Sequence, residues 1–196
     1  MNEELSIELC HLTVGYSKKG VHFSQLHQQN NNTQRGVHLS QLHPLGACCV
    51  ASDLNATALP GTLTCLIGHN GTGKSTLLRT IARLQPSIDG SVLIGDNDIS
   101  TLKPTHLSRM LSIVLTSRPD VRNMIVEELV ALGRARYTGF WGRLSADDRR
   151  IVLHSIESVG ITAMPERRVC PLSDGEMQKV MIAKSLAQQT PVIHVS

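Results

Sequence analysis

Short apolar runs alternate with amphipathic stretches along this chain, a pattern typical of an α/β fold. Residues 5–14 alternate in apolar character, which predicts a strand that ends near Gly15 and Tyr16. Residues 47–59 are expected to form a second strand pair or a meander. Short apolar runs bounded by turn residues predict four further strands, over residues 63–67, 91–94, 111–115 and 191–195.

Helical spacing of apolar residues separates these strands. It predicts helices over residues 75–84, 126–135, 146–159 and 175–189. Ser145 and Asp148 have the spacing of a capping box, which predicts where the third helix begins. In the fourth helix, Met177, Val180 and Met181 share one face, so that face is expected to be buried.

Residues 17–46 differ in composition, being rich in Gln, Asn, His and Gly. They contain a near-duplicate, because residues 20–27 and 36–43 differ at a single position. The four histidines of the two copies are His22, His27, His38 and His43. They could form a metal site, but a spacing of five does not place two histidines on one helical face. We therefore interpret the segment as an inserted, low-complexity polar loop.

Length and composition indicate a folded domain of ordinary size. The 196 residues are 41% apolar and 18% charged, enough to bury a core. With a net charge of +3 and only five aromatic residues, no nucleic-acid partner is expected. The five cysteines include no Cys-x-x-Cys pair, and we expect a reducing compartment. Neither a signal peptide nor an apolar run long enough to span a membrane is visible.

A glycine-rich loop between the strand at 63–67 and the helix at 75–84 carries the clearest chemistry. Its residues are Gly68, His69, Asn70, Gly71, Thr72, Gly73, Lys74, Ser75 and Thr76. They fit the phosphate-binding pattern G-x-x-x-x-G-K-[ST], in which backbone N–H groups and a helix start converge on phosphate oxygens. Lys74 would supply charge to the β- and γ-phosphates, and the Ser75 hydroxyl is a suitable ligand for Mg²⁺.

A second motif narrows the choice among phosphate-binding families. It comprises Leu172, Ser173, Asp174, Gly175 and Glu176, directly before a predicted helix. This run resembles the L-S-G-G-Q signature of ATP-binding cassette (ABC) ATPases, with Asp174 and Glu176 in place of Gly and Gln. A simple helix cap at Ser173 or Asp174 is the alternative interpretation.

The resemblance covers about residues 5–195, apart from the insert at 17–46. It implies the α/β fold of an ABC ATPase core with a phosphate-binding loop (P-loop), an antiparallel β subdomain and a helical subdomain near residues 118–170. The resemblance also implies that residues 1–196 form one ATP-binding domain, and that this domain is incomplete at its C-terminus. Tyr16 matches the family's adenine-stacking aromatic residue. The stretch 126–150, with Gly139–Gly142 at its middle, looks like the helical subdomain of importer ATPases that handle iron-siderophore, haem or cobalamin.

The resemblance also implies cofactors, partners and location. ATP and Mg²⁺ are the expected cofactors, and the signature would contact the ATP held by a second ATP-binding subunit, most simply another copy of the chain. Membrane permease subunits are the other expected partners. The expected location is the cytoplasm, peripheral to the inner face of the plasma membrane.

The sequence departs from the family pattern at catalytic positions. Thr116 follows the strand at 111–115 where the family has a glutamine, and Ser196 stands near the family's magnesium-orienting Asp. The family's catalytic Glu and switch His have no counterpart in the 196 residues, so no catalytic residue is assigned. His194 lies inside an apolar strand and is not expected to substitute. We therefore expect ATPase activity by family, but weak or absent in this chain.

Two alternatives stay open at this point. One is an ATP-binding module without turnover, which a phosphate-release assay would separate from an ATPase. The other is a soluble ABC ATPase outside transport, which would be expected to show coiled-coil insertions, zinc-binding cysteines or a second cassette; none is visible.

Overall fold

A computed structural model describes residues 5–17, 47–114, 121, 123–138 and 143–195. The chain divides into two compact units, and each is considered on its own. The N-terminal unit lies within residues 4–102, and the C-terminal unit within residues 103–196. Four predictions concern residues outside the described ranges: the insert from residue 18 to 46, Thr116, Gly139–Gly142 and Ser196.

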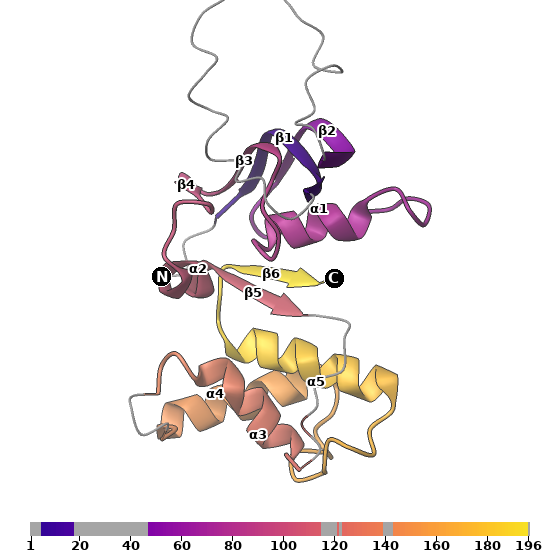
Figure 1. The fold of residues 1–196 in the computed structure, drawn as a ribbon. Coiled ribbons are helices and arrows are strands. Elements are labelled where there is room, and N and C mark those ends of the chain that lie inside the picture. Colours follow the sequence, from indigo (N-terminus) through magenta and orange to yellow (C-terminus); the bar gives the residue numbers. More distant parts are fainter. Residues whose placement is uncertain (1–4, 18–46, 115–120, 122, 139–142, 196) are drawn as a thin grey trace, which may run out of the picture. The chain divides into compact units, whose positions relative to one another are not determined.

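The N-terminal unit is built on an antiparallel sheet (Figure 1). Its strands are β1 (Ile7–Ser17), β2 (Ala47–Ala58), β3 (Asp89–Ile94) and β4 (Asn97–Asp98), in the spatial order β2-β1-β3-β4. β1 pairs along most of its length with β2, from Ile7 opposite Ala58 to Tyr16 opposite Cys48. The antiparallel β subdomain is therefore confirmed. The prediction of two strands over 47–59 is wrong, because this stretch forms one long strand.

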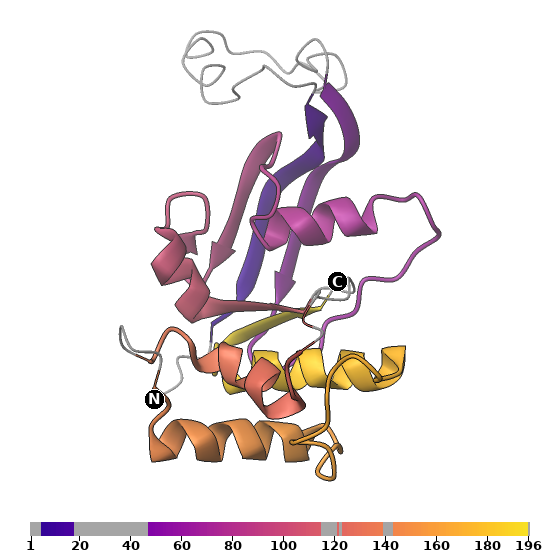
Figure 2. The ribbon, with the colours of Figure 1, turned by 60° about the horizontal axis from the view of Figure 1, so that its bottom comes forward.

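Helix α1 (Lys74–Ile81) packs against the sheet, as both ribbon views show (Figures 1 and 2). Leu12 and Val14 on β1 are fully buried. The helix is shorter than the predicted 75–84, since Arg83 adopts a left-handed backbone with φ of 54°. Leu84, the last residue of the predicted helix, consequently lies beyond the observed helix and is exposed.

The predicted strand over residues 63–67 does not form within the described part of the chain. The segment has no regular secondary structure, and the side chains of Leu63 and Ile67 are both 91% exposed. A strand requires a neighbouring strand that accepts its backbone hydrogen bonds. None of the described strands pairs with residues 63–67, so their apolar character alone does not produce a strand.

The C-terminal unit combines helices with a small parallel sheet. Its elements in order are α2 (Pro104–Met110), β5 (Leu111–Val114), α3 (Val126–Ala131), the 3₁₀-helix η3 (Leu132–Arg134), α4 (Ala146–Ser158), α5 (Asp174–Ala187) and β6 (Val192–Val195). β5 and β6 are parallel neighbours, with Leu111 opposite Val192. The sequence patterns identified all of these elements except α2, which begins at Pro104.

The core of the C-terminal unit lies among α3, α4 and α5. Val126, Val130, Val152 and Val180 are among its fully buried members. Met177 is buried and Met181 packs against the same cluster, which confirms the predicted buried face of the last helix. These contacts bring together residues about 50 positions apart in the sequence, so the three helices stabilise one another.

A buried ion pair ties the start of α4 to η3 and the end of α5. Arg134 Nε donates to Asp148 Oδ1 at 2.8 Å, and its Nη1 donates to the Ala187 carbonyl at 3.0 Å. The other Asp148 oxygen accepts from the N–H and hydroxyl of Ser145, completing the predicted capping box. Hydrogen bonds from Ser145, together with the Arg134 charge, hold the pKa of Asp148 below its usual value.

Replacing Asp148 by Ala is expected to cost about 3 kcal/mol of unfolding free energy, because the Arg134 charge is left buried without its partner. The lowered pKa means that this stabilisation is present above about pH 4 and disappears as the pH falls through the folded-state value. Urea unfolding followed by circular dichroism at pH 7 and pH 3 measures both effects. Glu157→Ala, an exposed change on the same helix, is the control. An unchanged midpoint for Asp148→Ala at pH 7 would contradict this role.

Candidate functional site

The predicted phosphate-binding loop turns sharply at its last glycine. Gly73 caps α1 with φ of 91° and ψ of 7°, and Gly71 has φ of 85°. Both values lie in the left-handed region that favours glycine. A Cβ atom on Gly73 would also lie 2.2 Å from Val50 Cγ1, so any side chain there would collide with β2. The turn that starts α1 therefore requires glycine for both its backbone angles and its packing.

The N-terminus of α1 is open to a ligand. No side chain caps it, and its first turn contains no acidic residue. The first N–H groups of a helix have no acceptor inside the helix, and the helix dipole places partial positive charge there. An incoming anion would meet unsatisfied donors at this end of α1.

The Lys74 ammonium folds back over the loop. Its Nζ donates to the carbonyls of Gly68 and His69, each at 2.6 Å. The Thr72 hydroxyl donates to the same His69 carbonyl at 2.9 Å, which tightens the loop. An ammonium has three donors, so one of them is available to an anion beyond these two carbonyls.

The remaining loop residues are accessible to a ligand. The side chains of His69, Asn70 and Ser75 are exposed. Ser75 follows the lysine, so its hydroxyl stands at the open helix end as a hard oxygen donor of the type Mg²⁺ prefers. The open N–H groups, the ammonium and this hydroxyl together fit a magnesium-bound polyphosphate.

The structure brings Tyr16 to the same loop from the end of β1. The Tyr16 hydroxyl and Thr76 Oγ1 are 2.8 Å apart, joined by a hydrogen bond. Thr76 is buried, at 4% exposure, whereas Tyr16 is 49% exposed. Sixty residues separate the two in sequence, and a large part of that interval is the insert, yet the aromatic ring lies beside the start of α1.

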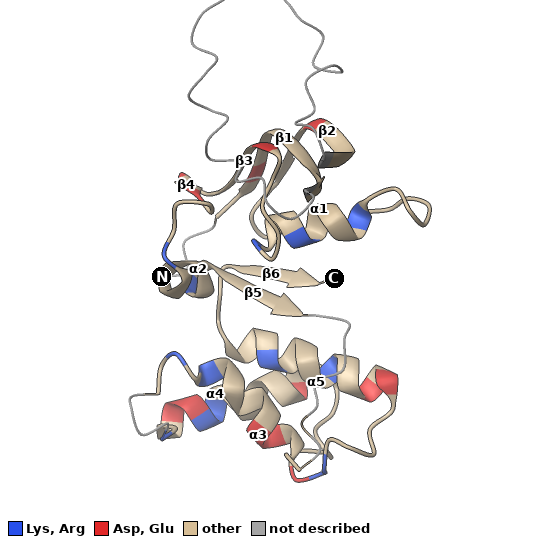
Figure 3. Cartoon of the chain, in the orientation of Figure 1, with Lys and Arg blue, Asp and Glu red and all other residues tan. Residues whose placement is uncertain are grey.

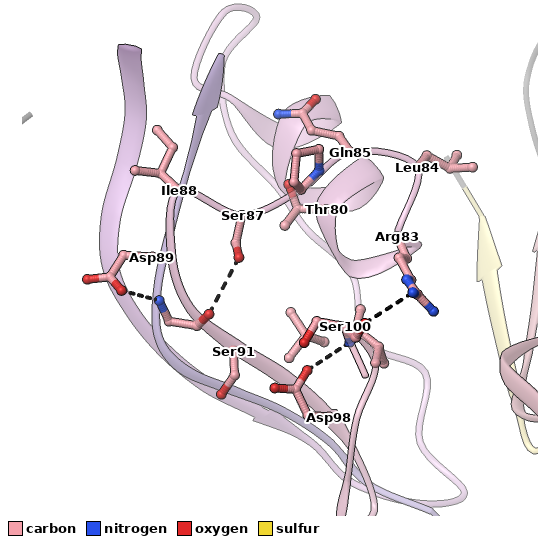
Figure 4. Close-up of a pocket in the computed structure, with 14 residues that line it drawn as sticks. Thr80, Arg83, Leu84, Gln85, Ser87, Ile88, Asp89, Ser91, Asp98 and Ser100 are labelled. Carbon is pink, nitrogen blue, oxygen red and sulfur yellow. Dashed lines mark hydrogen bonds between the residues drawn. The ribbon is translucent and has the colours of Figure 1, made fainter. Parts of the chain in front are cut away.

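A cavity of about 580 Å³ in the N-terminal unit is a separate feature (Figure 4). It lies between the end of α1 and the β3–β4 hairpin, and none of residues 68–76 lines it. The Arg83 guanidinium in its wall already donates to the carbonyls of Ser100 and Leu102. The carboxylates of Asp89 and Asp98 also line it, so the cavity is poorly suited to a phosphate.

The second predicted motif lies at the start of α5, where Leu172 is buried and Ser173 is the N-cap residue. Glu176 Oε2 accepts from the N–H and the hydroxyl of Ser173, both at 2.8 Å, and Arg167 Nη1 lies 3.0 Å from Oε1. The bonds from Ser173 and the Arg167 charge lower the pKa of Glu176. This helix end therefore already holds a carboxylate of its own chain.

The contrast between the start of α1 and the starts of α3, α4 and α5 is visible in the charge distribution (Figure 3). Acidic residues stand in the first turns of α3, α4 and α5, and each of these helices has a carboxylate bonded to the backbone at its N-cap. Among the described helices of eight or more residues, α1 alone lacks such a carboxylate.

Other candidate groups give no further site within the described ranges. His194 is buried on β6, and burial lowers its pKa, so the imidazole is neutral at pH 7. No cluster of three or more His, Cys, Asp or Glu side chains suited to a metal occurs among the described residues. No described helix combines the length and apolar character needed to cross a bilayer.

Two residues beside the predicted motifs were not identified from the sequence. Val50 fills the space against Gly73, and Arg167 pairs with Glu176 from nine residues upstream. Val50 belongs to a strand whose register is set by β1, and Arg167 lies in a loop without a motif. No local spacing connects either residue to its contact.

A family model described as ABC transporter matches residues 51–195, which include both motifs. The chain belongs to the ABC transporter family. This ABC family chain is 40% identical over 144 residues to an uncharacterized ABC transporter ATP-binding protein of Methanocaldococcus jannaschii, covering 74% of the chain and 50% of that protein. It is 35% identical over 144 residues to the iron(3+)-hydroxamate import ATP-binding protein FhuC of Bacillus subtilis. That alignment covers 74% of this chain and 54% of FhuC.

The fold agrees with the family. A nucleotide-free ATP-binding cassette from an ABC transporter superposes with a TM-score of 0.70 at 18% identity, covering 96% of this ABC chain and 67% of the other. The predicted ABC ATPase fold is thus confirmed. The chain spans about half the length of the curated relatives it matches.

The packing of Gly73 yields a direct test with Gly71 as the matched control. Both glycines have positive φ, so alanine at either position introduces backbone strain of about 1 kcal/mol. A Cβ at position 71 meets open space, whereas one at position 73 meets Val50. Gly73→Ala should therefore lower the melting temperature more than Gly71→Ala. Equal shifts in differential scanning calorimetry would contradict the close contact with β2.

Proposed function

We propose that this chain binds ATP with Mg²⁺ and serves as the energy-coupling, ATP-hydrolysing subunit of an ABC importer. The observation that carries the proposal is the start of α1, where Gly73 is left-handed, no described side chain caps the helix, and the Lys74 ammonium folds back over the loop. Membership of the ABC transporter family supports adenosine triphosphate as the ligand.

Each part of the loop has a distinct task in this proposal. The N–H groups of the loop and the first turn of α1 surround the phosphates, and Lys74 neutralises charge on the β- and γ-phosphates. The Ser75 hydroxyl binds Mg²⁺. Tyr16 stacks on the adenine ring, which its half-exposed side chain permits. The assignments of the loop residues rest on the phosphate-binding pattern, and that of Tyr16 rests on the family resemblance.

The cargo is proposed to be an iron-siderophore, haem or cobalamin. The similarity to FhuC, whose name specifies iron(3+)-hydroxamate import, supports the siderophore class. The partners would be membrane permease subunits and a second ATP-binding subunit, most simply a second copy. A subunit of this kind works in the cytoplasm at the inner face of the plasma membrane. The helical subdomain over 118–170 would make the permease contact.

The signature would act on the ATP of the second copy, through Ser173 and the start of α5. In the single chain, the Ser173 hydroxyl is bonded to Glu176. A γ-phosphate at this position would require that hydroxyl to turn away from the Glu176 carboxylate. Arg167, already paired with Glu176, would offset the negative charge that stays behind.

Hydrolysis by a polypeptide of these 196 residues is expected to be slow, because they contain no counterpart of the family's catalytic Glu. Loss of a carboxylate that orients the attacking water lowers the hydrolysis rate by a factor of roughly 10²–10⁴. Phosphate release under saturating ATP and Mg²⁺ measures it. Turnover near one per second would contradict the expectation of slow hydrolysis while leaving ATP binding in place.

Lys74→Ala is expected to weaken binding of a fluorescent ATP analogue at least about tenfold, since charge-assisted bonds to phosphate are lost. Titration in the presence of Mg²⁺ measures the dissociation constant. Lys179→Ala removes the same charge from an exposed position on α5 and should leave binding unchanged. Unaltered affinity of the Lys74 variant would refute the proposed phosphate site.

A further inference from the structure

The His69 carbonyl is the point at which the phosphate loop holds the side chain of its lysine. Lys74 Nζ donates to this oxygen and to the Gly68 carbonyl, each at 2.6 Å. The Thr72 hydroxyl donates to the same His69 oxygen at 2.9 Å. A carbonyl oxygen has two lone pairs, so the ammonium and the hydroxyl together match the acceptor capacity of His69.

The Thr72 hydroxyl lies close to the lysine stem as well as to the carbonyl. A Cβ atom on Gly68 would be 3.2 Å from Thr72 Oγ1 and 3.9 Å from Lys74 Cδ. The hydroxyl and the stem of the lysine therefore lie on the same side of Gly68, where a side chain would otherwise stand. This places the Thr72 oxygen beside the group that it helps to hold.

Few other bonds restrain the peptide that carries the His69 carbonyl. Residues 68–71 are exposed and lie outside helices and strands. The backbone N–H of Thr72 is 3.5 Å from the His69 oxygen, beyond the usual range of a hydrogen bond. Glycine at positions 68 and 71 allows the backbone on both sides of this peptide to rotate widely. The direction of the carbonyl thus depends on the bonds from the two side chains.

The single proton of the Thr72 hydroxyl is already used in this bond. A hydroxyl has one O–H donor, and its lone pairs accept hydrogen bonds. A phosphate oxygen is also an acceptor, so the Thr72 oxygen in this orientation offers it no hydrogen bond. An effect of Thr72 on phosphate binding would therefore act through the loop and its lysine.

We infer that Thr72 is a positioning residue: its hydroxyl holds the His69 carbonyl in the direction that fixes the Lys74 ammonium over the loop, where a phosphate can meet it. The inference rests on the proposed function, since it assumes that phosphate binds there. A lysine side chain that is already held in place loses less rotamer freedom on binding, which favours higher affinity.

Thr62 provides a matched comparison for the loss of an exposed threonine hydroxyl. Its hydroxyl donates to the Leu59 carbonyl at 2.6 Å, across the same three-residue separation as the bond from Thr72 to His69. Thr62 is exposed like Thr72, and it lies before the phosphate loop. Thr62→Val therefore removes an equivalent bond without changing one to His69.

The first measurement is the acetylation of Lys74 by acetic anhydride in the ligand-free full chain, followed by mass spectrometry. Lys179, exposed on α5, is the internal reference. We expect Thr72→Val to raise the rate at Lys74 relative to Lys179, because the carbonyl that holds the ammonium is no longer fixed. Thr72→Ser, which keeps the hydroxyl, should restore the ratio, and Thr62→Val should not change it. An unchanged ratio in Thr72→Val would overturn the inference, and a simultaneous loss of phosphate affinity would instead indicate a direct contact with phosphate.

The second measurement is the affinity for ATP and for inorganic tripolyphosphate in the presence of Mg²⁺. Thr72→Val is expected to weaken both about three- to tenfold, the effect of one lost hydrogen bond. Both ligands should respond equally because the ammonium acts on the phosphates that they share. Thr72→Ser should recover the affinity, and Thr62→Val should bind like the original chain. Weakening of ATP alone, or an equal loss in Thr62→Val, would contradict the inference.

A further variant covers the case in which Thr72→Val does not fold. Thr72→Ala removes the same hydroxyl from the same exposed position and is carried through both measurements. A changed acetylation ratio with unaltered affinities would also overturn the inference, because the position of the ammonium would then not affect binding.

The design separates this inference from the proposed function. If the original chain binds neither ATP nor tripolyphosphate, the proposed function fails, and the role of Thr72 in phosphate binding fails with it. If the original chain binds both ligands through Lys74, but Thr72→Val changes neither acetylation nor affinity, the nucleotide site stands and only the positioning role is refuted.

Discussion

The backbone turn at Gly73 is the constraint on which the rest of the candidate site depends. Its left-handed conformation ends the loop and starts α1 at Lys74, and the lack of a side chain allows Val50 of β2 to pack against it. Because the turn fixes where α1 begins, it also fixes the direction of the first N–H groups and places Lys74 and Ser75 in the first turn of the helix. The groups proposed to bind phosphate and Mg²⁺ thus begin at one glycine, packed against the strand behind it.

The starts of the longer helices that the structure describes are of two kinds, and the difference has a simple electrostatic cause. At α4 and α5 a carboxylate of the same chain, Asp148 or Glu176, already occupies the positive end of the helix. At α1 no side chain does so. A helix end satisfied from within is stable by itself, whereas an unsatisfied end gains free energy when an external anion binds. In the single chain, the second motif therefore forms the capped N-terminus of α5.

Sequence patterns identified most elements because periodicity and turn chemistry are local. The capping box at Ser145, the helix start at Ser173, the apolar face of α5 and the glycine-rich loop all depend on residues within a few positions of one another. The apolar run at 63–67 shows the limit of this approach. Five apolar or small residues meet the local criterion for a strand, but a strand also needs a paired neighbour, which is a property of the whole sheet.

The phosphate-loop pattern, the helix caps and the family resemblance were thus determined by the sequence alone, since each is encoded in adjacent residues whose backbone preferences act over one turn. The tertiary structure decided the contacts between distant elements: Tyr16 with Thr76, Val50 with Gly73, and Arg134 with both Asp148 and the end of α5. These contacts follow from strand register and helix packing, which arise only when segments far apart in the chain bury apolar surface against each other.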